Sequence, residues 1–240
     1  MKKIFNFFIG NFVLFNVVCA SSSLEIGSHC VEAYRKAQYQ EADVLLEQSP
    51  RDCLHAHSPP NGATLLHYAA GRLRLEDVKK FVNVDGEDVD WIDSSGNTPL
   101  HYVCFFHPDN KDEHMSIERR IEIINIILDK KPSLLNAKNA KGQTALHLLA
   151  SSSKVDKIFL TLLAHDVDWN VQDRHLRTPL HYACIMKQKA FIEFLINYQI
   201  VNINIHLDDE TGKKAFEEIY PCSFDLVEVT LKLIEKYPQK

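Results

Sequence analysis

The feature that most constrains this chain is a short segment that recurs along it. TPLHYVC at residues 98–104 returns as TPLHYAC at 178–184, and related segments are NGATLLHYAA at 61–70 and KGQTALHLLA at 141–150. Successive threonines in these segments are 34, 46 and 34 residues apart, at Thr64, Thr98, Thr144 and Thr178. A period of this length predicts an array of stacked units rather than one globular core.

A second apolar run with helical spacing follows each copy. These runs are LEDVKKFV (75–82), IEIINIIL (121–128), VDKIFLTLL (155–163) and KAFIEFLI (189–196). A fifth, degenerate copy is TGKKAFEEIY (211–220), followed by FDLVEVTLKLI (224–234). Each first segment is too short to bury its own apolar face, so neighbouring units are expected to cover one another.

This unit resembles the ankyrin repeat, a β-turn followed by two antiparallel helices with the signature Thr-Pro-Leu-His-x-Ala. The resemblance implies an all-α repeat fold, an ankyrin-type solenoid of stacked helix-turn-helix units with β-hairpin loops. It covers about residues 58–237, with expected units at 58–92, 93–138, 139–172, 173–208 and 209–237. Residues 21–57 are expected to form an N-terminal helical cap or a degenerate first repeat.

The repeated segment has a physical explanation within that fold. Threonine caps the first helix, and proline fits its first turn because the missing N–H has no partner there. Leucine and alanine face the neighbouring unit. The family resemblance implies that the histidine rings hydrogen-bond to backbone between adjacent turns, at His67, His101, His147 and His181.

Three departures from the family pattern stand out. Leucine takes the glycine position of the fourth hairpin at Leu176. The glycine that usually follows the first helix is also replaced, which predicts distorted junctions, at Leu73, His107, Ser153 and Lys187. The unit that contains Gly96 is thirteen residues longer than a 33-residue repeat, and its turn formers predict a polar loop over residues 107–119.

The N-terminal segment MKKIFNFFIGNFVLFNVVCA places two lysines before an apolar run that ends in small residues. This pattern predicts a signal peptide over residues 1–20, with an uncleaved anchor as the alternative. Its removal would change the formal charge from −5 to −7, because it contains Lys2 and Lys3 and no acid. Such a charge favours no nucleic-acid partner. The expected location is exported, periplasmic or secreted.

The cysteine pattern fits no complete disulfide framework. Removal of the leader would leave five of the six cysteines, an odd number. Cys104 and Cys184 are expected to be buried and too far apart to bond. Cys30 and Cys53 flank the first helical pair and could form a bridge in an oxidising compartment.

No recognised catalytic motif is present in the sequence. His107, Asp109, Asp112, Glu113 and His114 are metal-ligand types, but they have no ligand spacing and are expected to form a solvated loop. A second histidine cluster, at Cys53, His55 and His57, is interpreted as a loop between repeats. We therefore expect no enzyme activity, metal or cofactor; a metal-dependent enzyme using histidines of the cap and the insertion is the alternative.

Binding of a protein partner is what the family resemblance implies, through hairpin tips and the exposed ends of the first helices. The resulting candidate residues are Arg72, Trp91, Ser94, Ser95, Asn97, Phe105, Phe106, Lys141, Gln143, Arg174, His175, Arg177, Ile185 and Met186. Trp169 is expected either to join them or to pack internally. The prediction is a non-catalytic, monomeric, exported protein with a protein partner and no membrane contact after cleavage; the alternative is an effector delivered into a host cell.

Overall fold

A computed structural model describes residues 23–58, 60–82, 89–105, 113–152, 156–198, 200, 202–219 and 224–238. The predicted signal segment lies outside these residues, as do Phe106, His107, Pro108 and Ser153. Within the described residues, no helix combines the length and the apolar content needed to cross a bilayer.

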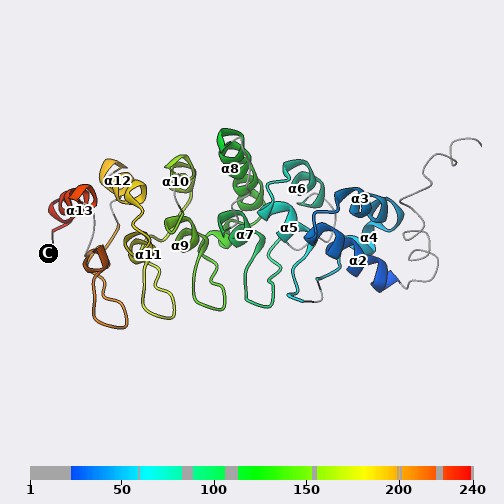
Figure 1. Ribbon diagram of the computed structural model, residues 1–240, viewed down its shortest axis with the longest axis horizontal. Helices are drawn as coiled ribbons and strands as arrows, with labels where there is room; N and C mark the ends of the chain where they lie inside the picture. Colours follow the sequence, from blue (N-terminus) through cyan, green and yellow to red (C-terminus); the bar gives the residue numbers. More distant parts are fainter. Residues whose placement is uncertain are drawn as a thin grey trace, which may run out of the picture.

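The helices form an inner and an outer row along one axis (Figure 1). The inner helices are α5 (Leu65–Gly71), α7 (Pro99–Phe105), α9 (Ala145–Ala150) and α11 (Pro179–Ile185), continued by the short 3₁₀ helix η2 (Ala215–Ile219). The outer helices are α6 (Leu75–Val82), α8 (Glu113–Lys130), α10 (Asp156–Leu163), α12 (Lys189–Tyr198) and α13 (Phe224–Lys236). A second 3₁₀ helix, η1 (Pro132–Asn136), follows α8. The first three helices of the described residues are α2 (Ser23–Arg35), α3 (Tyr39–Gln48) and α4 (Pro50–Leu54).

Helices of the same row contact their neighbours in chain order: α5, α7, α9 and α11 in the inner row, and α6, α8, α10 and α12 in the outer row. The repeated leucines occupy equivalent buried positions, at Leu66, Leu100, Leu146 and Leu180. Apolar burial between neighbours therefore holds the array together, since each short helix has its apolar face covered by the next unit. This arrangement confirms the predicted helical solenoid.

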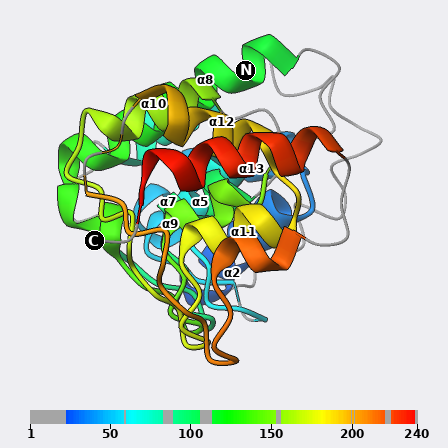
Figure 2. The same cartoon turned by 90° about the vertical axis from the view of Figure 1, so that its left-hand side faces the viewer.

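The loops between units extend to one side of the helices and stack on one another (Figure 2). Backbone hydrogen bonds join successive tips: Ala140 N donates to Ser95 O at 2.8 Å, and Arg174 N donates to Lys141 O at 3.0 Å. Close packing favours glycine at such a tip, although Leu176 adopts the same left-handed backbone, with φ 56°, in the next loop. Gly142 has φ +77°, and a Cβ there would lie 2.9 Å from Arg174 N.

A polar side chain also braces each of three successive loops. The Asp93 carboxylate oxygen Oδ1 accepts from the backbone N–H groups of Ser95 and Asn97, both at 2.8 Å. Asn139 and Asp173 make the same pair of bonds in the next two loops. Among the described residues these loops form no β-strand. They contain an isolated antiparallel β-bridge between Asp208 and Lys214.

The long unit differs from its prediction. A polar loop was expected over residues 107–119, but α8 already begins at Glu113 and runs for 18 residues. The prediction was wrong for residues 113–119 because apolar residues at helical spacing continue through them. Ile117 and Ile121 pack against the core, and Ile124 is buried. The rest of the predicted loop lies outside the described residues.

The helix junctions keep their family geometry without glycine. Leu73 has φ 56° and Lys187 has φ 58°, both in the left-handed region. At the junction between α11 and α12, Lys187 N donates to Cys184 O at 3.1 Å and Gln188 N donates to Ala183 O at 2.8 Å. Ala37, between α2 and α3, has φ 61° and the same bonding pattern. The expected distortion is therefore absent at the two described junctions, and strained residues retain the turn.

Candidate interaction surface

Four buried histidines fix the position of each loop relative to the preceding helix. In the second unit, His101 Nδ1 accepts from the Thr98 backbone N–H at 3.2 Å, and Nε2 lies 3.0 Å from Gln143 O in the next loop. Since Nδ1 accepts, the ring proton sits on Nε2 and is donated to that carbonyl. The same bonds recur, with the expected inter-unit partners, at His67, His147 and His181.

Burial keeps these rings neutral. Desolvation lowers the pKa of His67 and of His147 to about 4, although a backbone carbonyl acceptor opposes the shift. The pKa values of His101 and His181 are lowered for the same reason. The predicted structural role of the four histidines is confirmed by their contacts.

The surface between the loop tips and the inner helices, here called the concave face, contains a groove of about 700 Å³. Its wall includes predicted residues from two loops and two helix ends: Arg72, Ser94, Ser95, Asn97, Phe105, Lys141 and Gln143. Phe105 is 68% exposed at the end of α7. An exposed phenylalanine in this groove is the feature that most clearly indicates a contact surface.

A hydrogen-bonded network forms the floor of the groove. Tyr68 Oη donates to Asn61 Oδ1 at 3.1 Å, Asn61 Nδ2 donates to Tyr102 Oη at 3.4 Å, and Tyr102 Oη donates to Asp93 Oδ2 at 3.0 Å. Burial and the nearby Asp93 carboxylate raise the pKa of Tyr102. Asn139 extends the network to the next loop through Asn97 Oδ1 at 3.0 Å. The floor is therefore held in one geometry before any partner arrives.

Sequence reasoning missed several residues of this groove. Arg35, Asn61, Tyr68, Tyr102 and Leu148 line it but were absent from the predicted set. The tyrosines carried a signal, because each follows the repeated histidine. Arg35 carried none, since its α2 helix lies in the least regular part of the array.

Not every predicted residue is accessible to a partner in the groove. Gln143 lines the groove but is only 9% exposed, and its Nε2 donates to Tyr182 Oη at 2.7 Å, so its role is structural. Trp91 is 41% exposed and stacks on His57, with ring centroids 4.3 Å apart, outside the groove lining. Trp169 is buried against Phe191 and Phe194, which settles its internal position. Phe106 lies outside the described residues.

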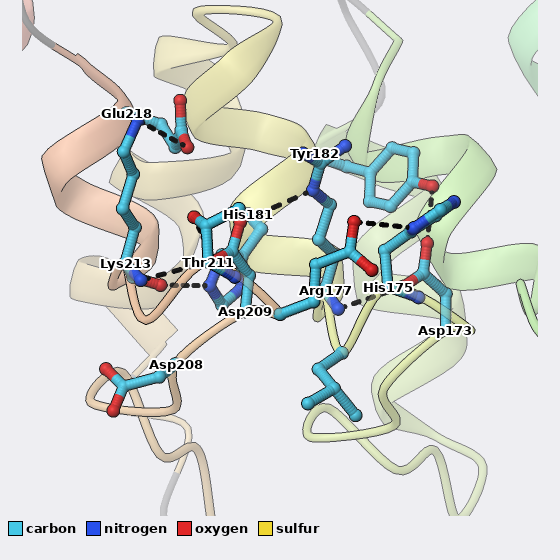
Figure 3. A network of polar contacts seen from close by, with 12 residues as sticks. Asp173, His175, Arg177, His181, Tyr182, Asp208, Asp209, Thr211, Lys213 and Glu218 are labelled. Atoms are coloured by element: carbon cyan, nitrogen blue, oxygen red, sulfur yellow. Dashed lines mark hydrogen bonds and ion pairs between the residues drawn. The ribbon is translucent and has the colours of Figure 1, made fainter.

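A second predicted group lies in the following unit: Arg174, His175, Arg177, Ile185 and Met186. Met186 is 53% exposed and Ile185 is half-buried. His175 Nδ1 lies 2.8 Å from Glu210 Oε1, and Arg177 Nε lies 3.6 Å from Asp209 Oδ2. These contacts connect the last two loops (Figure 3), so part of this group joins units rather than facing a partner.

The degenerate final unit explains why that network differs from the others. Glu218 stands where three of the four earlier units have tyrosine, and it pairs with Lys213 at 3.6 Å instead of reaching the loop aspartate (Figure 3). Burial would raise the pKa of Asp209, but hydrogen bonds from Thr211 and the Lys213 backbone outweigh it and lower the pKa to about 2. Glu217 replaces the repeat histidine and accepts from Lys214 N at 3.2 Å. The helix cap is therefore kept although the residues changed.

Among the described residues, no group of three histidine, cysteine or acidic side chains could hold a metal ion. His107, Asp109 and Asp112 lie outside those residues. Cys53 is buried in α4 and Cys30 is buried in α2, and the structure holds both as free thiols. The neighbouring Cys53 side chain, followed by burial, raises the pKa of Cys30.

Comparison with known proteins agrees with this geometry. A family model described as ankyrin repeats (3 copies) matches residues 114–214. The human neurogenic locus notch homolog protein 1 is 30% identical over 134 residues, which cover 54% of this chain and 5% of that protein. The Xenopus laevis protein of the same name is 27% identical over 180 residues, 71% of this chain and 7% of its own length. A putative ankyrin repeat protein of Acanthamoeba polyphaga mimivirus is 30% identical over 94 residues, 39% of this chain and 22% of its own.

This chain spans less than a quarter of the length of each of these relatives, so the similarity concerns the repeats and not the whole proteins. The histidine and loop contacts, the stacked helix pairs and the matched segment lead to one conclusion. Residues 114–214 are ankyrin repeats, and the chain is homologous to ankyrin-repeat proteins.

Proposed function

We propose that this chain captures another protein on its concave face and has no catalytic activity of its own. The groove around Phe105 carries this proposal, because it combines an exposed aromatic ring with a preformed polar floor. Interfaces commonly use such an aromatic anchor inside a polar surround. The four repeat histidines have both ring nitrogens occupied by scaffold contacts, which supports a non-catalytic role for them.

Export is a second part of the proposal. It is supported by the two lysines and the apolar run at residues 1–20 of the sequence. Expression in a bacterium followed by N-terminal sequencing should find a mature chain beginning near Ser21 in the periplasm or the medium. Recovery of the mature chain inside a host cell would instead identify it as a delivered effector, and an intact leader in the membrane fraction would contradict cleavage.

The test of the binding role uses crosslinking to the native partner in cells that produce the protein. Phe105→Ser should remove most of the crosslinked complex, since truncation of a central aromatic anchor commonly costs about 2 kcal/mol or more of binding free energy. Lys130→Glu, at the exposed end of the outer helix α8, is the matched control and should leave the complex intact. An unchanged complex with Phe105→Ser, in a variant that melts like the parent, would contradict binding at the groove.

A further inference from the structure

Two tyrosines of the inner helices connect neighbouring loops through their hydroxyl groups. Tyr182 Oη donates to Asp173 Oδ2 in the loop of its own unit and accepts from Gln143 Nε2 in the preceding loop, both at 2.7 Å. Tyr102 Oη likewise donates to Asp93 Oδ2 at 3.0 Å and accepts from an asparagine amide of the preceding loop at 3.4 Å. In both places one hydroxyl group therefore bridges a donor on one loop and a carboxylate on the next.

The last junction of the array keeps the donor and the carboxylate but not the tyrosine. Asp209 is the carboxylate of the final loop, Arg177 occupies the donor position on the loop before it, and Glu218 stands at the tyrosine position (Figure 3). The Glu218 carboxylate turns to Lys213 Nζ, at 3.6 Å. Arg177 Nε and Asp209 Oδ2 are also 3.6 Å apart, which is too far for a hydrogen bond between them.

The two facing atoms are buried, and neither forms a hydrogen bond with any of the described residues. The other oxygen of the same carboxylate, Asp209 Oδ1, accepts from Thr211 N at 2.8 Å, Thr211 Oγ1 at 2.7 Å and Lys213 N at 3.1 Å. Although burial opposes ionisation, these bonds lower the pKa of Asp209 to about 2. A buried, ionised oxygen without a donor is costly, so Oδ2 marks a position for one.

A hydroxyl group fits the space between these atoms. Its oxygen can lie about 2.8 Å from both Asp209 Oδ2 and Arg177 Nε when the two are 3.6 Å apart. It would donate to the first atom and accept from the second, as Tyr182 Oη does one unit earlier. An ammonium group has no acceptor and a carboxylate has no donor, so neither can form both bonds.

The earlier units also show where the ring of such a hydroxyl group lies. The rings of His67 and Tyr102 meet edge to face with centroids 5.0 Å apart, and those of His147 and Tyr182 do so at 5.5 Å. His181 is the repeat histidine at the last junction, and its Nε2 lies 3.3 Å from the backbone oxygen of Lys213 in the final loop. An aromatic ring that carries the bridging hydroxyl group would therefore pack against His181.

Long, partly exposed side chains border this position. Arg177 is 32% exposed, Lys213 55% and Glu218 22%. Such side chains change rotamer without repacking of the buried helices, so a ring can enter from the side of the loops.

We propose that the position between Arg177 and Asp209 binds a tyrosine side chain of a partner protein, whose hydroxyl group takes the place of the one that Glu218 does not supply. The phenol donates to Asp209 Oδ2, accepts from Arg177 Nε and packs its ring on His181. Because the acceptor is ionised, the hydroxyl group should contribute strongly to binding. This position lies at the last two loops and not in the groove around Phe105, so it goes beyond the proposed function and can fail without it.

Titration of the isotope-labelled protein with two tripeptides, followed by NMR, tests the proposal. Acetyl-Gly-Tyr-Gly-amide should shift the Arg177 Nε–H signal and the backbone amides of Thr211 and Lys213 saturably. Acetyl-Gly-Phe-Gly-amide should bind about tenfold more weakly, because it lacks the hydroxyl group that bonds to a charged oxygen. Equal affinities for the two peptides, or no saturable shift with either, would overturn the proposal.

Two variants locate the peptide. Asp209→Asn should reduce the affinity for the tyrosine peptide to that for the phenylalanine peptide. Its loop should keep its shape, since Asn139 already forms the same pair of backbone bonds in the third unit. Phe105→Ser should bind the tyrosine peptide like the parent, which separates this site from the groove. Loss of the peptide in Phe105→Ser but not in Asp209→Asn would place it in the groove and contradict the site.

Glu218→Tyr gives an independent readout, because it supplies the hydroxyl group from the chain itself. The variant should have a higher urea midpoint than Glu218→Phe, and the tyrosine peptide should no longer shift its Arg177 Nε–H signal. Equal midpoints, or unchanged peptide binding, would contradict the geometry. Saturable binding of p-cresol without binding of the tyrosine peptide would overturn the protein partner and identify a small phenol as the occupant.

Discussion

Among single residues, the repeat histidines show how one side chain connects two units. His101 caps its own helix through Nδ1 and donates from Nε2 to the next loop, while the ring is almost completely buried. His101→Leu would keep the volume but leave the Thr98 N–H and the Gln143 carbonyl without this partner. Two buried groups deprived of a hydrogen bond should lower the free energy of unfolding by about 2–4 kcal/mol.

Urea unfolding followed by circular dichroism measures this change. His55→Leu is the matched control, because His55 is exposed in a loop, and it should change the stability by less than about 0.5 kcal/mol. Equal effects for the two substitutions would show that the ring of His101 does not connect the units.

The cysteine pair gives a second prediction for single residues, and the bridge between Cys30 and Cys53 is still a prediction. Both thiols are buried and free in the reduced protein, and Cys30 Sγ donates to Ala42 O at 3.7 Å. With oxidised glutathione as the oxidant, the two thiols should lose two protons and two electrons to form one bond, while glutathione is reduced. Intact-mass measurement should then show the loss of two hydrogen atoms. The Cys30→Ser variant should not show it, and two thiols that stay alkylatable in the oxidised parent would rule the bridge out.

Among loops and helices, the residues at positive φ separate backbone strain from burial. Lys187 and Leu73 have nearly the same φ, but Lys187 is exposed whereas Leu73 is 3% exposed. Lys187→Gly should raise the free energy of unfolding by about 0.5–1 kcal/mol, because glycine adopts this conformation without a steric cost. Leu73→Gly should lower it by about 1–3 kcal/mol, because the lost side-chain burial outweighs the relieved strain.

Thermal and urea unfolding of both variants check these opposite signs. Lys130→Gly near the end of α8 serves as the control for glycine in helical backbone, where a loss of up to about 1 kcal/mol is expected. A stabilised Leu73→Gly variant would mean that the leucine side chain contributes nothing to the packing at this junction.

The same elements show what the sequence could and could not predict. The repeated Thr-Pro-Leu-His-Tyr segment was sufficient for the stacking order, because stacking depends on residues that recur at fixed spacing. The histidine contacts and the loop tips followed from its resemblance to the ankyrin repeat. The sequence did not predict where α8 begins. The turn formers near Pro108 suggested a loop, while the apolar residues from Ile117 onward fit a helix. The groove was predicted only in part, because Arg35 reaches it from a helix without the repeat signature.

Across the whole array, the neutral histidines make stability depend on pH in a defined window. A histidine in the unfolded chain titrates near pH 6.5, whereas burial lowers the pKa of His67 and of His147 to about 4. The unfolded state therefore binds more protons than the folded state between these values, and stability falls as the pH falls from about 6.5 to about 4. Protonation of each of these two rings should lower the free energy of unfolding by on the order of 3 kcal/mol between pH 6.5 and pH 4.

The carboxylates whose pKa values are lowered act at a more acidic pH. Asp209 and Glu32 have pKa values of about 2, so their contribution to the free energy of unfolding is lost mainly below pH 4. Urea midpoints measured at steps from pH 7 to pH 4.5 should therefore report mostly histidine protonation. In the His147→Gln variant the midpoint should be lower at pH 7 but should fall less steeply with acid, because one titrating ring is gone.

Since each unit contacts only its neighbours, protonation at one ring should weaken one junction first, and the acid transition should broaden relative to that at neutral pH. A midpoint that stays constant from pH 7 to pH 4.5 would show that these rings are not held neutral by the fold.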